Sequence, residues 1–80
     1  MNALLTPQPL ALASLPRRAR GVVVGHGTTA ALSERLAAVG LGVGAQVEVV
    51  QSGSRTLVQV SETRIALGPE LASAVQVLRR

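Results

Sequence analysis

His26 is the only histidine of this 80-residue chain. Histidine is the side chain best suited to acid–base chemistry near neutral pH, and it is a common metal ligand. Few other side chains could take part in catalysis, because the sequence contains no cysteine, aspartate, lysine or tyrosine. A serine or threonine could be paired with His26 and a glutamate, but no spacing selects such a set. We therefore predict no catalytic residue and a non-enzymatic protein.

Metal binding is the other chemical role that His26 could have. His26 lies between Gly25 and Gly27, in a loop where an ordinary exposed histidine is also expected. A tight site needs three or four ligands, so Glu48, Glu62 or Glu70, or a second chain, would have to complete it. Nothing in the spacing indicates this. The sequence leaves open only weak binding of Fe2+ or Zn2+ at His26.

Two glycine-rich segments resemble phosphate-binding loops only superficially. Residues 21–27 lack the Lys-Ser/Thr pair of a P-loop, and Gly40-x-Gly42-x-Gly44 precedes a strand rather than a helix. Their role is therefore predicted to be structural. Gly40 is placed to end a helix in the left-handed conformation, and Gly44 to form the turn that follows.

The basic residues are the next candidates for binding. All the cations are arginines, and the net charge of +4 would suit an anionic partner. Arg17, Arg18 and Arg20 form a run that is most simply a solvated surface. The chain contains no aromatic residue, so the stacking platforms of barrels that bind single strands are missing. Nucleic-acid binding is therefore the least favoured function.

Residues 33–49 organise the elements that would position these groups. They read as the end of an amphipathic helix, a glycine stop, a turn and an alternating strand. Thr28 or Thr29 can cap the helix. The apolar stripe of this helix is predicted to consist of Leu32, Leu36 and Val39.

The rest of the chain is predicted to form short strands. These are residues 21–25, 46–51, 56–61, 65–67 and 75–78, with a helical turn at 69–72 that begins after Gly68. One helix and about five strands indicate a mainly β fold, a small and partly open barrel. Because Pro7 and Pro9 disfavour regular structure, residues 1–14 are predicted to be an extended or flexible lead-in, and residues 15–80 the single domain.

The location of the protein is inferred from missing signals. No apolar run approaches the length of a membrane span, and no lysine or arginine precedes the faintly signal-like Ala11–Ala13. We therefore expect a cytoplasmic protein that does not insert into the membrane.

The ordered series of motifs resembles the FeoA family. The matching residues are Arg35-Leu36 before Gly40-Leu41, Gly44 before Val47-x-Val49, Ile65-Ala66-Leu67-Gly68, Leu71-Ala72 and Val75-x-Val77. No single piece is specific, but together they span residues 12–78. The resemblance implies an SH3-like β-barrel with an inserted helix, acting in bacterial ferrous iron uptake. It also implies an association with FeoB, the membrane transporter.

The resemblance supplies no set of catalytic or ligand-binding residues. The contact surface is therefore inferred from the residues of this sequence. Apolar side chains on a glycine-rich turn suggest a surface that includes Arg35, Leu41 and Val43. A homodimer through a strand edge would cover Val50, Leu57 and Leu78, which are expected to face outward. The alternative function is a metal-responsive regulatory module that binds a divalent ion weakly.

Overall fold

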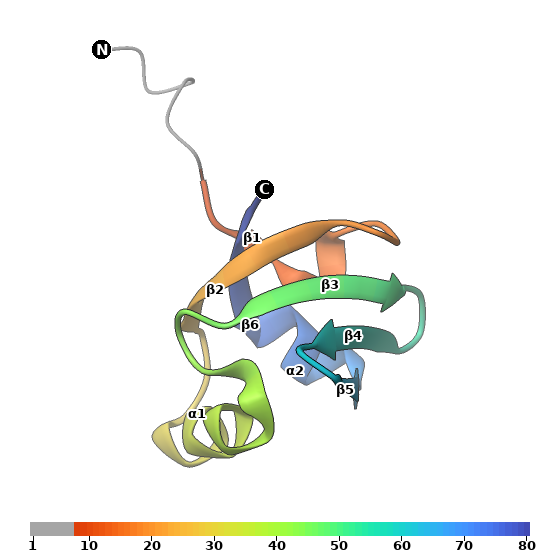
Figure 1. The fold of residues 1–80 in the computed structure, drawn as a ribbon. Coiled ribbons are helices and arrows are strands. Elements are labelled where there is room, and N and C mark those ends of the chain that lie inside the picture. Colours follow the sequence, from red (N-terminus) through yellow and green to blue (C-terminus); the bar gives the residue numbers. More distant parts are fainter. Residues whose placement is uncertain (1–7) are drawn as a thin grey trace, which may run out of the picture.

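A computed structural model of the chain describes residues 8–80 (Figure 1). Its elements in chain order are β1 (Leu10–Ala11), the 3-10 helix η2 (Leu12–Ser14), β2 (Arg20–His26), α1 (Ala30–Leu36), the π-helical turn η3 (Ala37–Leu41), β3 (Gln46–Gln51), β4 (Thr56–Val60), β5 (Thr63–Leu67), α2 (Pro69–Ala74) and β6 (Val75–Arg79). None of the helices in this part of the chain is long and apolar enough to cross a lipid bilayer.

The strands form one antiparallel sheet in the order β1-β6-β2-β3-β4-β5. The predicted mainly β fold with one main helix is confirmed, and every strand expected from the sequence is present. The sheet has six strands rather than five, because the two-residue β1 pairs with β6. Within residues 8–80, β1 and β5 remain at opposite edges without pairing, so hydrogen bonds do not close the barrel.

The N-terminal boundary lies earlier than the sequence suggested. Leu10 pairs with Val77 in the sheet, and Leu12 and Leu15 are buried in the core. Residues 10–14 are therefore part of the fold and not of a lead-in. Pro9 has no N–H to donate, which explains why the ordered pairing starts directly after it. The remainder of the predicted lead-in, residues 1–7, lies outside the described residues.

The segment between β2 and β3 is called here the helical insertion, residues 30–41. Thr29 caps its first turn, since its hydroxyl accepts a hydrogen bond from the Leu32 N–H at 3.3 Å. The predicted stripe holds for Leu36, which is buried, but Val39 is 51% exposed. Regular helical geometry ends at Gly40, whose φ is +105°, and Val39 directly before it lies in solvent.

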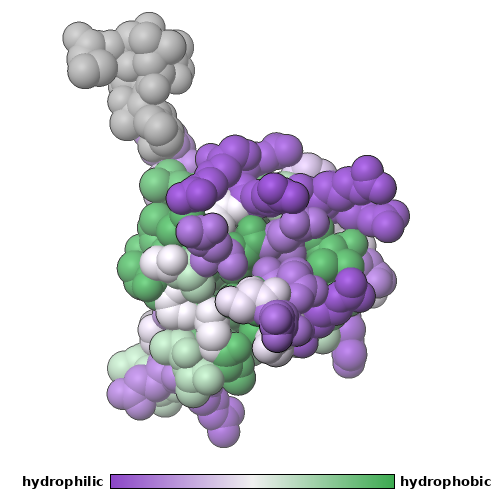
Figure 2. All heavy atoms as spheres, viewed as in Figure 1, coloured by the Kyte–Doolittle hydropathy of each residue, from purple (hydrophilic) through white to green (hydrophobic). Residues whose placement is uncertain are grey.

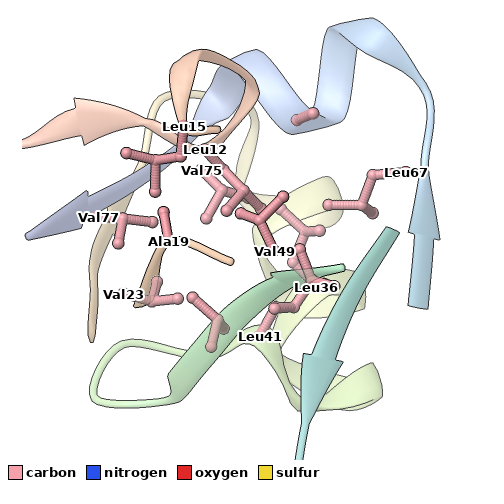
Figure 3. Close-up of a cluster of buried hydrophobic side chains, with 13 residues drawn as sticks. Leu12, Leu15, Ala19, Val23, Leu36, Leu41, Val49, Leu67, Val75 and Val77 are labelled. Atoms are coloured by element: carbon pink, nitrogen blue, oxygen red, sulfur yellow. The ribbon is translucent and has the colours of Figure 1, made fainter. Parts of the chain in front are cut away.

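One hydrophobic cluster fills the space enclosed by the sheet and the helices (Figure 3). Its buried members are Leu12, Leu15, Ala19, Val23, Leu36, Leu41, Val47, Val49, Val58, Leu67, Ala72, Val75 and Val77. Leu36 and Leu41 join this cluster from the helical insertion, and Ala72 joins it from α2. The insertion is thus anchored to the sheet by two leucines, each contributing about 1.5–3 kcal/mol when fully buried.

Candidate partner-binding surface

His26 is the last residue of β2, and its half-buried ring connects that strand to the helical insertion. Nδ1 lies 2.6 Å from Ser33 Oγ in α1. Nε2 lies 2.7 Å from the carbonyl oxygen of Leu41, at the end of η3. Both ring nitrogens therefore have partners, and the two partners come from the two ends of the insertion.

The Leu41 carbonyl decides which nitrogen carries the proton. A carbonyl oxygen can only accept, so Nε2 must be the donor in this bond. In the neutral ring Nδ1 then accepts from the Ser33 hydroxyl. We call this pair of bonds the His26 clamp. It fixes the insertion relative to β2, which is a positioning role.

The clamp constrains any metal binding at His26. Coordination would require one ring nitrogen to exchange its hydrogen-bond partner for the ion. Among residues 8–80, no group of three histidine, cysteine, aspartate or glutamate side chains is placed to hold a metal ion. Glu48, one of the glutamates considered from the sequence, instead accepts a hydrogen bond from Arg20. Metal binding at His26 stays a prediction.

The three residues expected at the partner surface separate in the structure. Arg35 is exposed on α1, and Val43 is 71% exposed in the turn before β3. Leu41 has 0% exposure, so the expectation that it faces a partner is wrong for the folded protein. The reason lies in Gly40, whose φ of +105° reverses the chain and directs Leu41 into the core (Figure 3).

Val39, rather than Leu41, is the exposed apolar residue of the helical insertion. Leu10, Val39 and Val43 are the large hydrophobic residues exposed in residues 8–80, and Val39 and Val43 both belong to the insertion and the turn that follows it. We call Arg35, Val39 and Val43 the insertion surface. The apolar stripe in the sequence assigned Val39 to the core, so sequence reasoning missed it.

The other glycines selected from the sequence shape turns and caps. Gly44 has φ of +95°, and its N–H donates to the Val23 carbonyl at 2.7 Å, joining the turn to β2. Gly68 precedes α2, and its carbonyl accepts from the Ala72 N–H at 3.0 Å. The φ of Gly68 is −70°, so this position does not require glycine.

The comparison with protein families identifies this fold. The sequence model of the family described as FeoA domain matches residues 10–79. The chain belongs to the FeoA family. This family is associated with ferrous iron transport and is not known as an enzyme family. A comparison with curated proteins gives no match.

Solved structures agree with the family assignment. The chain is 32% identical to FeoA of Stenotrophomonas maltophilia, a prokaryotic SH3 domain protein solved in complex with zinc; the match covers 88% of each chain, with a TM-score of 0.72. The chain is 26% identical to an iron uptake regulatory protein (FeoA). That match covers 91% of this chain and 99% of the FeoA chain, with a TM-score of 0.84. The predicted SH3-like fold is therefore confirmed.

The same fold also occurs as a part of larger proteins. A manganese-dependent transcriptional repressor covers 94% of this chain with a TM-score of 0.83, but this chain spans only 44% of the repressor's length. At 18% identity this likeness concerns the fold alone.

Proposed function

We propose that this FeoA protein is a non-enzymatic accessory protein of bacterial ferrous iron uptake that binds and modulates the FeoB transporter on its cytoplasmic side. The family match over residues 10–79 is the observation that carries this proposal, since it includes nearly all of the described fold. The Stenotrophomonas maltophilia relative has been suggested to act as a ferrous iron transport activating factor.

The insertion surface is the proposed contact. Val39 and Val43 keep half or more of their accessible area in water, although the other large aliphatic residues of residues 8–80 are more completely buried. A partner that covered them would recover hydrophobic free energy of about 25 cal/mol per Å². The exposed guanidinium of Arg35 on the same insertion would add a directional polar contact.

A pull-down with the cytosolic region of the transporter tests this contact. We expect Val43→Asp and Val39→Asp to reduce retention, because each places a charge in an apolar interface. Leu41→Asp is unsuitable, because Leu41 is a core residue and a buried carboxylate in its place would unfold the domain. Leu10→Asp is the matched control, since Leu10 is exposed on β1 outside the insertion. Equal retention of wild type and both valine variants, with unchanged thermal melts, would reject this surface.

Self-association is a further part of the proposal. The β5 edge has no partner strand within the described residues, so a second copy could pair there and form a homodimer. Val50, Leu57 and Leu78 are half-buried rather than fully exposed, which leaves a smaller apolar area for such an interface than the sequence implied. Sedimentation that gives only monomer at high protein concentration would exclude the homodimer.

A weak divalent site at His26 is the second candidate, favoured by the zinc complex of the 32% identical relative. Titration calorimetry with Fe2+ and Zn2+ tests it, with His26→Gln as the comparison. Heat that is lost in this variant would support metal binding at the ring. Equal heat in both proteins, or none in either, would exclude His26 as a ligand.

A further inference from the structure

Two adjoining hollows of about 620 and 240 Å³ lie over β2, β3 and β4. They share Arg18, Glu48 and Gln59, so we treat them as one feature, the arginine groove. Six arginines line it: Arg17, Arg18, Arg20, Arg64, Arg79 and Arg80. In Figure 2, strongly hydrophilic side chains gather over the region where β2 and β3 lie in Figure 1.

The positive charge of the groove is largely uncompensated. Glu48 is the only acid in its lining, and Arg20 Nε lies 3.2 Å from Glu48 Oε1. This is the one ion pair within residues 8–80. Arg64 Nε donates to the neutral Gln59 amide at 2.9 Å. A cleft that gathers one sign of charge attracts a ligand of the opposite sign.

The backbone of the groove is strained at two positions. Arg18 and Ser61 are the non-glycine residues with positive φ in residues 8–80, at +76° and +53°, and both line the larger hollow. Arg18 is the third residue of the turn closed by the Ala19 N–H and the Pro16 carbonyl at 3.1 Å. With φ positive at the third residue and not at Arg17, this is a type II turn, in which glycine is preferred at the third residue.

An arginine at this position works against the stability of the turn. Residues in sparsely populated backbone conformations concentrate at sites where they serve a function. Arg18 lines both hollows, so its charge lies next to the whole groove. The strain at Arg18 therefore points to a ligand that this guanidinium contacts.

We propose that the arginine groove binds an extended, acidic peptide segment of a partner protein. Guanidinium groups match carboxylates in planar geometry, and Arg20 already pairs with one carboxylate, that of Glu48, within the groove. Ala19, Gly21 and Val47, none of which carries a long side chain, line the larger hollow between these arginines.

A nucleic acid fits the groove less well. The chain offers no aromatic side chain on which bases could stack. Glu48 borders both hollows, so a continuous phosphate backbone would meet a carboxylate midway along its path. A peptide can instead place its acidic side chains on either side of Glu48.

Acidic-peptide binding in the arginine groove extends the proposed function. It rests on that function only if the acidic segment belongs to the transporter. Fluorescence anisotropy with a labelled peptide of alternating Glu and Gly residues tests the groove alone. Its failure would leave the pull-down result intact, and the failure of the pull-down would leave the groove intact.

The decisive comparison uses three arginine variants. Arg64→Gln and Arg18→Gly remove cations from the groove, whereas Arg55→Gln removes an exposed cation from the β3–β4 loop, outside both hollows. We expect about two- to fivefold weaker peptide binding for each groove variant and an unchanged affinity for Arg55→Gln. Arg18→Gly should also raise the melting temperature, because glycine suits the positive φ. This separates loss of binding from loss of folding.

Several results would overturn the proposal. One is the absence of any peptide binding at low ionic strength. Another is equal weakening by Arg55→Gln, which would show attraction to net charge alone. Tighter binding of duplex DNA or of vesicles containing anionic lipid, at the same salt concentration, would assign the groove to a different class of ligand.

Discussion

Removing the His26 clamp should destabilise the whole domain by an amount that can be worked out from its two bonds. His26→Ala deletes the contacts at 2.6 Å to Ser33 and at 2.7 Å to the Leu41 carbonyl. Each intramolecular hydrogen bond contributes about 0.5–1.5 kcal/mol net, so the expected loss is about 2 kcal/mol. For a domain of 80 residues, this corresponds to a decrease in melting temperature of about 8–16 °C.

Two further variants divide the clamp into its parts. Ser33→Ala removes only the bond to Nδ1 and should cost about 1 kcal/mol. His26→Gln keeps an amide N–H that can reach the Leu41 carbonyl but lacks the Nδ1 acceptor, so it should resemble Ser33→Ala. Thermal and urea denaturation followed by circular dichroism measure these differences.

Hydrogen exchange adds a local readout to the same experiment. In His26→Ala the amides of α1 should lose protection more than those of β3 and β4, because both lost bonds hold the insertion directly and local opening adds to the global loss. A melting temperature of His26→Ala within about 2 °C of wild type would refute the clamp, as the two bonds would then contribute almost nothing.

Three core predictions follow from backbone geometry and burial. Gly21→Ala should prevent folding, because a Cβ there would collide with Val77 Cγ1 and with the Leu78 carbonyl; the absence of a cooperative melt in this variant checks this. Gly40→Ala should cost about 1–2 kcal/mol, because φ is +105° while the space for a Cβ is ordinary, and an unchanged urea midpoint would contradict this. Leu41→Ala should cost about 2–5 kcal/mol from the cavity it leaves, and a smaller loss in urea denaturation would argue against full burial.

Local rules predicted the elements of the sheet well. The alternation in residues 46–51 gave the bounds of β3 directly, and the Thr28–Thr29 pair, of which Thr29 is the cap, and Gly40 marked the two ends of the helical segment. These signals are carried by neighbouring residues, so they can be recognised without knowing the fold. β1 was missed because two residues after Pro9 are too few to show a period, and its pairing depends on β6, more than sixty residues away.

The candidate sites depended on contacts that the sequence does not display. Leu41 is buried after the chain reversal at Gly40, whereas Val39, directly before Gly40, is exposed at the end of the helical segment. The His26 clamp joins residues that are 7 and 15 positions apart, to a hydroxyl and to a main-chain carbonyl. The arginine groove draws its cations from three separate parts of the chain, of which only the run at residues 17–20 was recognisable.

The strand order also determines when this protein can fold. β6 lies between β1 and β2, so the N-terminal strand has no partner until the last strand has been synthesised. The neighbours β2, β3, β4 and β5 follow one another in the chain and can pair earlier. During synthesis the free edge of β2 and the apolar side chains of Leu12 and Leu15 therefore remain uncovered until Val75 and Val77 of β6 have been made, and such surface is prone to aggregation.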